Sequence, residues 1–271
     1  MSATYHRILL ASEGTEFDVG AERVALDLAA QWRLPLLAVI AVVSNPEFEI
    51  VAPYLAERAE GAAATHLEHL RQAASRRGVE LAGTVRLGDT PYKEIVGEAR
   101  ERGADLIVLR RRGKRGFLAN ALVGAMSHSV IGHAPCDVLI VARAARLWSQ
   151  GIVLATDGSP HSARAAEASA RVALRSSLPV TVVCVAQDDA ARATANVEAA
   201  TASLLAAGVR ADGRTPHGKP HEAILGVARE VRADLIVVGR RGLGQVERLF
   251  LGSTSERVAG FADCPVLIAR G

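Results

Sequence analysis

The sequence predicts an α/β protein made of two tandem, doubly wound domains. Segments of the first half recur in the second half in the same order, and short aliphatic runs alternate with helix-like segments. Aliphatic runs without polar alternation are typical of strands buried on both faces. Alternating strands and helices favour a parallel sheet, with ligands bound at the carboxyl ends of its strands.

Three segments of the first half return in the second: 6–14 as 150–158, 103–109 as 232–238, and 133–140 as 261–268. A repeat of this kind indicates duplication of one structural unit. The matches predict a boundary near residues 144–150, and we expect domains at 1–145 and 150–271. Because the linker at 144–149 is short, the two halves are expected to pack together.

The second half shows the order of elements most clearly. Its aliphatic runs predict strands near residues 151–156, 179–186, 209–214, 234–238 and 265–270. Ser159 followed by Pro160 favours a helix start, and Pro220 opens another helix in the same way. The segment 45–78 of the first half is longer than its counterpart 188–207. This predicts either helices of unequal length or a partner-binding extension.

Composition narrows the function classes. Of the 271 residues, 49% are hydrophobic and the net charge is +3, so nothing requires a nucleic-acid partner. The basic run at 110–115 lacks interleaved aromatic residues; it is either a solvated loop or a contact for another anion. The N-terminus shows no signal-peptide pattern, and no apolar run reaches the roughly 18 residues that span a membrane. We therefore expect a cytoplasmic protein without membrane contact.

A glycine motif follows the predicted strand 234–238. Gly239 and Gly242 are separated by two residues, and nine more residues lead to Gly252 and Ser253. Glycine lets the backbone approach a ligand closely, and the start of a helix with hydroxyl side chains favours an anion. The spacing resembles the ATP-binding signature of the universal stress protein family, Gly-x2-Gly-x9-Gly-(Ser/Thr).

The resemblance implies a Rossmann-like fold with a five-stranded parallel sheet in each half, and ATP bound with Mg²⁺. The sequence does not choose among ATP, ADP and AMP. By resemblance Asp157 lies near the ribose and metal, although a turn-forming role also fits it, and Val185 presents backbone groups to the adenine. The expected nucleotide-binding residues are Thr156, Asp157, Val185, Gly239, Arg241, Gly242, Gly252, Ser253, Thr254 and Ser255. Arg240 and Arg241 either reach a phosphate or are solvated.

The first half departs from this motif at four points. Glu13 stands in place of Asp157, Arg110 replaces the first glycine, ten residues separate Gly113 from Gly124, and Ala125 replaces the serine. The larger side chains are expected to intrude on the pocket, and a hydroxyl is lost. We therefore expect one ATP per chain, bound in the second half. No catalytic residue is assigned.

Three functions remain open from the sequence. The first is a nucleotide-binding regulatory protein of the stress response, with at most slow ATPase activity and an unknown protein partner. The second is an enzyme of the adenine-nucleotide α-hydrolase class, and the third is a scaffold without nucleotide. The family's single-domain members pair through their last strands, which predicts an intramolecular pseudo-dimer through 137–143 and 265–270. Homodimerisation of the whole chain is left open.

Overall fold

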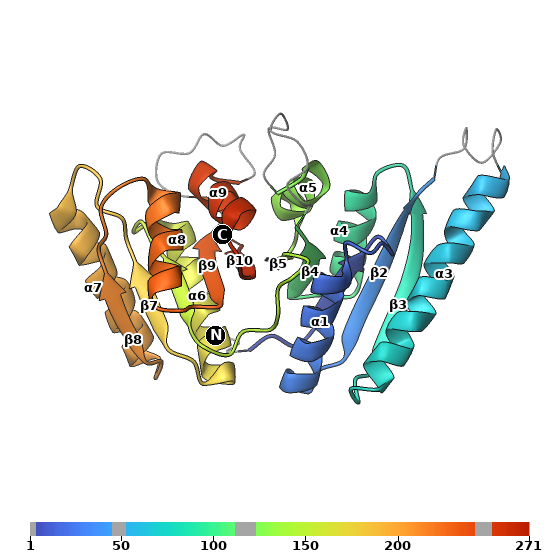
Figure 1. Ribbon diagram of the computed structural model, residues 1–271, viewed down its shortest axis with the longest axis horizontal. Helices are drawn as coiled ribbons and strands as arrows, with labels where there is room; N and C mark the ends of the chain where they lie inside the picture. The colour runs from blue at the N-terminus through green and yellow to red at the C-terminus, as the bar shows by residue number, and fades with distance from the viewer. Residues whose placement is uncertain (1–3, 45–52, 112–122, 242–250, 271) are drawn as a thin grey trace.

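The computed structural model describes residues 4–44, 53–111, 123–241 and 251–270. Within these ranges, both halves contribute five strands to one continuous ten-stranded sheet (Figure 1). The strand order is β3-β2-β1-β4-β5-β10-β9-β6-β7-β8. Neighbouring strands are parallel except at the centre, where β5 and β10 run antiparallel. The predicted fold, two doubly wound halves with five strands each, is confirmed.

The elements of the first half are β1 (Ile8–Ser12), α1 (Val19–Trp32), β2 (Leu36–Val43), α3 (Pro53–Ser75), β3 (Leu81–Gly88), α4 (Pro91–Glu101), β4 (Leu106–Arg110), α5 (Ala125–His133) and β5 (Asp137–Val141). Those of the second half are β6 (Ile152–Ala155), α6 (Pro160–Ser176), β7 (Val180–Val183), α7 (Ala190–Ala206), β8 (Ala211–Arg214), α8 (Pro220–Glu230), β9 (Leu235–Gly239), α9 (Ser253–Phe261) and β10 (Val266–Ala269). The unequal segments noted in the sequence form helices of 23 and 17 residues, α3 and α7.

Local sequence explains where helices begin and end. The hydroxyl of Ser159 accepts a hydrogen bond from the Ser162 amide, and Pro160 occupies the first turn of α6, as predicted. The C-cap residues of α1 and α6, Arg33 and Ser177, both adopt left-handed backbone angles, with φ of 53° and 56°. Matching caps at matching positions show that the two halves share local geometry as well as topology.

The repeated Ala-Asp pair before β4 and β9 has a structural role in both halves. The carboxylate of Asp105 accepts hydrogen bonds from the amides of His6 and Arg7, and that of Asp234 accepts one from the Gly151 amide. Each aspartate therefore ties the start of its own strand to the start of the first strand of its half.

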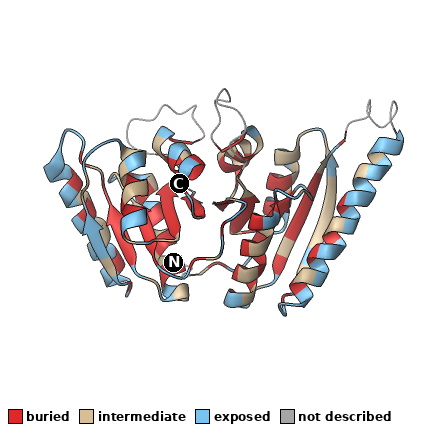
Figure 2. Ribbon diagram, viewed as in Figure 1, coloured by how far each residue is buried: buried red, intermediate tan, exposed pale blue. Residues whose placement is uncertain are grey.

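Two hydrophobic clusters cover the sheet. One contains buried residues of α1, α3, α6 and α7, and the other contains those of α4, α5, α8 and α9. Figure 2 shows that the inner strands are largely buried, whereas the edge strands β3 and β8 are not, and α3 and α7 expose much of their outward surface. None of the helices in the described ranges is long and apolar enough to cross a bilayer.

The halves join through their last strands, as predicted for a pseudo-dimer. Val266 pairs with Ile140, and Leu267 pairs with Leu139. A second contact between the halves is made by Arg171, which donates to Asp137 Oδ2 at 2.6 Å. The Tyr5 hydroxyl, in the first half, donates to the same oxygen at 2.6 Å. Burial, together with this carboxylate, raises the pKa of Tyr5 well above its usual value. The two halves therefore form one packed body.

Two arginines at matching repeat positions cross between the halves. Arg111 donates to the carbonyls of Ala259 and Ala262 at the end of α9, and Arg240 donates to the carbonyl of Gly132 near the end of α5. Cations at the carboxyl ends of helices satisfy orphan carbonyls and favour the helix dipole. From the sequence, Arg240 is expected either to reach a phosphate or to be solvated. In the structure its guanidinium is half-buried between the halves and bonds a helix carbonyl.

Candidate functional site

In the second half, the turn after β6 forms one side of the predicted site. The hydroxyl of Thr156 donates to Ser162 Oγ at 3.0 Å, and the Ser159 amide donates to Asp157 Oδ1 at 3.0 Å. Asp157 is thus a turn-forming residue here, the alternative role considered from the sequence. Carboxylates accept several hydrogen bonds, so this bond leaves acceptor capacity on Asp157.

Gly239, the last residue of β9, lies against the first turn of α6. A Cβ placed on Gly239 would lie 2.7 Å from the carbonyl oxygen of His161 and 3.1 Å from the Ser162 amide nitrogen. The glycine is therefore needed for backbone packing between β9 and α6. The motif predicts that Gly239 approaches a ligand, whereas the contact seen here is with the backbone of α6. The ligand contact stays a prediction.

The start of α9 is fastened to the end of β9. The Gly252 amide donates to the carbonyl of Arg240 at 2.9 Å, and the Ser255 hydroxyl donates to that of Gly239 at 2.7 Å. The first half repeats the second bond, from Ser127 to the carbonyl of Arg110. Because both halves share it, this serine ties helix to strand, and Ser253 and Thr254 are the predicted hydroxyl residues left at the helix start.

These contacts bring most of the predicted residues to one edge of the sheet. The start of α6 and the start of α9 each contact the end of β9, and Val185 follows β7, the neighbour of β6. Gly242 lies outside the described residues, so its predicted role has no structural counterpart here. The N-termini of α6 and α9 both lie beside the end of β9, and helix N-termini favour an anion.

Positive charge gathers at the same edge. The pKa of His161, in the first turn of α6, is lowered by burial and then by the nearby cations Arg240 and Arg241. The pKa of Arg240 is itself lowered, first by burial and then by Arg241 and Arg270. Positive charges that lower the pKa of a neighbouring basic group would also stabilise an anion placed beside them.

The equivalent edge of the first half carries an internal ion pair. Arg110, at the position of Gly239, bonds the carboxylate of Glu13, and its Nε lies 3.2 Å from Asp18 Oδ1. Asp18 is 1% exposed and also accepts hydrogen bonds from the amide and hydroxyl of Thr15. Burial raises the pKa of Asp18, against the opposing effects of these hydrogen bonds and of Arg110. Both acidic side chains therefore face the one arginine.

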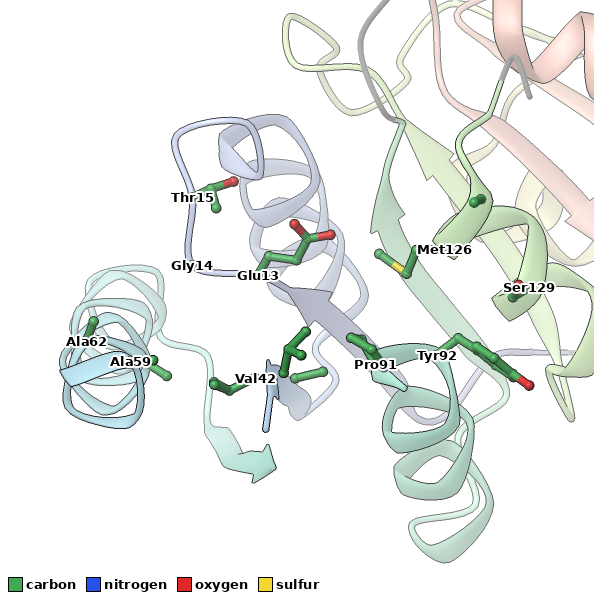
Figure 3. A pocket seen from close by; sticks show the side chains of 14 residues that line it. Glu13, Gly14, Thr15, Val42, Ala59, Ala62, Pro91, Tyr92, Met126 and Ser129 are labelled. Atoms are coloured by element: carbon green, nitrogen blue, oxygen red, sulfur yellow. The ribbon is translucent and has the colours of Figure 1, made fainter. Parts of the chain in front are cut away.

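A cavity of about 650 Å³ opens beside Glu13, one member of this ion pair (Figure 3). Glu13 and Thr15 line it from the turn after β1, Ala59 lines it from α3, and Met126 lines it from α5. Glu13 was expected to intrude on a pocket, and its side chain does border this one. Sequence reasoning did not foresee that a cavity of this size would remain.

Two features of the site were missed from the sequence. Asp18 has no motif around it, although it lies five residues after Glu13 and both face Arg110. The sequence does contain a signal for the ion pair, because an arginine, Arg110, replaces a glycine at one repeat position while Glu13 supplies a carboxylate at another. The helix-capping contact of Arg240 was not readable, because it depends on how the halves pack.

Comparison with known proteins gives consistent results. The model of the universal stress protein family matches residues 4–142 and again residues 149–270. A universal stress protein of Thermus aquaticus is 51% identical over 71 residues, which are 26% of this chain and 52% of that protein. One of Mycobacterium bovis is 28% identical over 226 residues, covering 76% of this chain and 70% of that protein.

The matches with other relatives are partial: one with a Synechocystis universal stress protein covers 58% of that protein, at 27% identity over 61% of this chain. Among solved structures, a universal stress protein of Archaeoglobus fulgidus superposes with a TM-score of 0.82. That alignment covers 99% of this chain and 97% of the other at 22% identity, which supports the fold. With the family model matched in both halves, this chain belongs to the universal stress protein family as a tandem-domain member.

Proposed function

We propose that the second half binds ATP with Mg²⁺ and that the first half does not, so that each chain holds one nucleotide. Nucleotide occupancy would then regulate the conformation or partner choice of a cytoplasmic stress-response protein. The observation that carries the proposal is the edge at which the starts of α6 and α9 both contact the end of β9, with Arg240 and Arg241 directly following that strand. A polyphosphate is the ligand chemistry that such an edge favours.

The residues at this edge fit a nucleotide that carries its own metal ion. Mg²⁺ is usually held by one or two carboxylates together with substrate phosphates and water. Asp157 supplies one carboxylate beside the helix starts. Within the described ranges no cluster of three or more His, Cys, Asp or Glu side chains is arranged to hold a metal by itself. Asp157 would therefore contact the metal or ribose, and Ser253 and Thr254 would donate to phosphate oxygens.

A regulatory role is supported by the contact between the halves. Arg240 directly follows Gly239, and its side chain donates to Gly132 at the end of α5. A nucleotide that shifts the backbone after β9 would therefore also shift a contact with the first half. That coupling offers a route from occupancy to conformation without chemistry on the nucleotide.

Calorimetric titration of the nucleotide-free chain with MgATP tests the proposal. We expect one site per chain. Ser253→Ala is expected to weaken binding by about 1–3 kcal/mol, the range for a lost hydrogen bond to a charged group, and Gly252→Trp to abolish it by filling the phosphate space. The control is Ala125→Ser, which restores the hydroxyl at the matching position of the first half and should change nothing. Two equivalent sites, or unchanged affinity in both second-half variants, would refute the assignment.

A further inference from the structure

The cavity of the first half has an apolar wall on most sides. Its described lining includes Val42 and Val43 at the end of β2, Ala59 on α3, Tyr92 on α4 and Met126 on α5. In Figure 3 the alanines of α3 lie across the cavity from Tyr92 and Met126. A volume of about 650 Å³ is in the range of sites that hold drug-sized molecules. The space therefore suits a compact ligand with much apolar surface.

One lining residue leaves a large apolar surface uncovered. Val43 is 58% exposed although it borders the cavity. An apolar side chain exposed at the border of a concave surface gains favourable free energy when a ligand removes it from water. An apolar ligand in the cavity would cover Val43.

The charges at the cavity disfavour an anion. Among the described lining residues Glu13 is the one carboxylate, and Lys, Arg and His are absent. Arg110 is held by Glu13 and Asp18, so that two carboxylates face one guanidinium. His66, which lies against Gly14, is hydrogen-bonded to Glu22. A phosphate or sulfonate placed beside Glu13 would meet a carboxylate, and like charges brought together lower affinity.

We propose that the first half binds an uncharged, predominantly apolar small molecule that presents a hydroxyl or N–H group to Glu13. The Glu13 carboxylate bonds Arg110 through Oε2, and a carboxylate has room for further donors. The apolar body of the ligand lies against Val43, Ala59 and Met126. This inference does not depend on the ATP site of the second half, and it gives the two halves ligands of different chemistry.

Two fluorescent probes that differ by one group test the proposal on the full chain. N-phenyl-1-naphthylamine is uncharged and carries one N–H, and 8-anilinonaphthalene-1-sulfonate adds a sulfonate to the same skeleton. We expect saturable binding of the amine at one site per chain, with the sulfonate at least tenfold weaker. Saturating MgATP should not displace the amine. Absence of saturable binding, equal binding of both probes, or displacement by ATP would overturn the proposal.

Substitutions locate the probe. Ala59→Trp fills the cavity from α3 and should weaken amine binding at least tenfold, whereas Ala64→Trp, an exposed position of the same helix outside the lining, should not. Glu13→Gln removes one negative charge and should strengthen sulfonate binding at least fivefold. This last variant changes a surface-accessible side chain, so it reads out charge even if Ala59→Trp fails to fold. Equal loss in both tryptophan variants, or unchanged sulfonate binding in Glu13→Gln, would contradict the site.

Discussion

The two halves have the same fold but carry different charges at the same edge of the sheet. In the second half, Gly239 lets the first turn of α6 pack on β9, and the cations Arg240 and Arg241 lie close to that turn. In the first half, Arg110 takes the place of that glycine and is held by Glu13 and Asp18. One topology thus carries a cationic edge and a self-neutralised one.

The exchange of Gly239 for Arg110 goes together with a different start of the first helix in each half. α6 begins at Pro160, whereas α1 begins at Val19, three residues later in the aligned repeat. The early turn of α6 is what approaches Gly239, with His161 in contact. Arg110, with its larger side chain, accompanies the later helix start, and Asp18 then faces its guanidinium. The comparison teaches that ligand chemistry in this fold is set by a few residues at strand ends, and not by the sheet.

The largest expected effect is loss of the buried ion pair. Arg110→Leu leaves Asp18 buried without its cation, and breaking such a pair costs about 3 kcal/mol of unfolding free energy. Arg143 pairs with Glu16 in the same half, but these side chains are 59% and 67% exposed. Arg143→Leu should therefore cost less than about 1 kcal/mol. Urea denaturation of both variants measures the difference, and equal costs would show that the Arg110 pair is not a buried one.

The next effect tests the glycine of the second half. Gly239→Ala places a Cβ 2.7 Å from the His161 carbonyl oxygen. Because backbone on both sides must shift, we expect a loss of about 2 kcal/mol of unfolding free energy. In Gly226→Ala, within α8, the added Cβ meets no atom within 4 Å, so this control should gain about 0.5–1 kcal/mol from helix propensity. Thermal denaturation of the pair should give melting temperatures that move in opposite directions. A shift of the same sign in both would contradict the packing role.

The sequence was sufficient for the fold because the repeat and the aliphatic runs are local signals. The strands predicted at 151–156 and 265–270 correspond to β6 and β10, and the predicted pairing of the last strands is present. The site was less readable. Gly239 and Ser255 both fit a ligand motif, yet their described contacts hold α6 and α9 to β9. A sequence motif shows which residue types occur at a position. The packing of the chain is needed to tell whether such a residue contacts backbone or a ligand.

The smallest effect concerns a histidine that the second half lacks. His66 on α3 lies against Gly14, and its Nε2 is 2.7 Å from Glu22 Oε1. At the corresponding place Asn196 on α7 lies against Gly158 and does not titrate. The hydrogen bond with Glu22 is the main cause of the raised pKa of His66, with burial opposing it.

A raised folded-state pKa means that protonated His66 is more favourable in the folded chain than in the unfolded one. Its contribution is fully present below the ordinary value of 6.5 and is lost as the pH rises through the folded-state pKa. Since the pair is partly solvated, the contribution should be below about 1 kcal/mol. Urea denaturation of the wild type and of His66→Gln should therefore differ more at pH 5.5 than at pH 8.5. Asn196→Gln provides the control, because its free energy of unfolding should differ from that of the wild type by an amount that does not vary with pH. If the difference for His66→Gln is also independent of pH, or grows toward high pH, the Glu22 contact carries no protonation-linked stability.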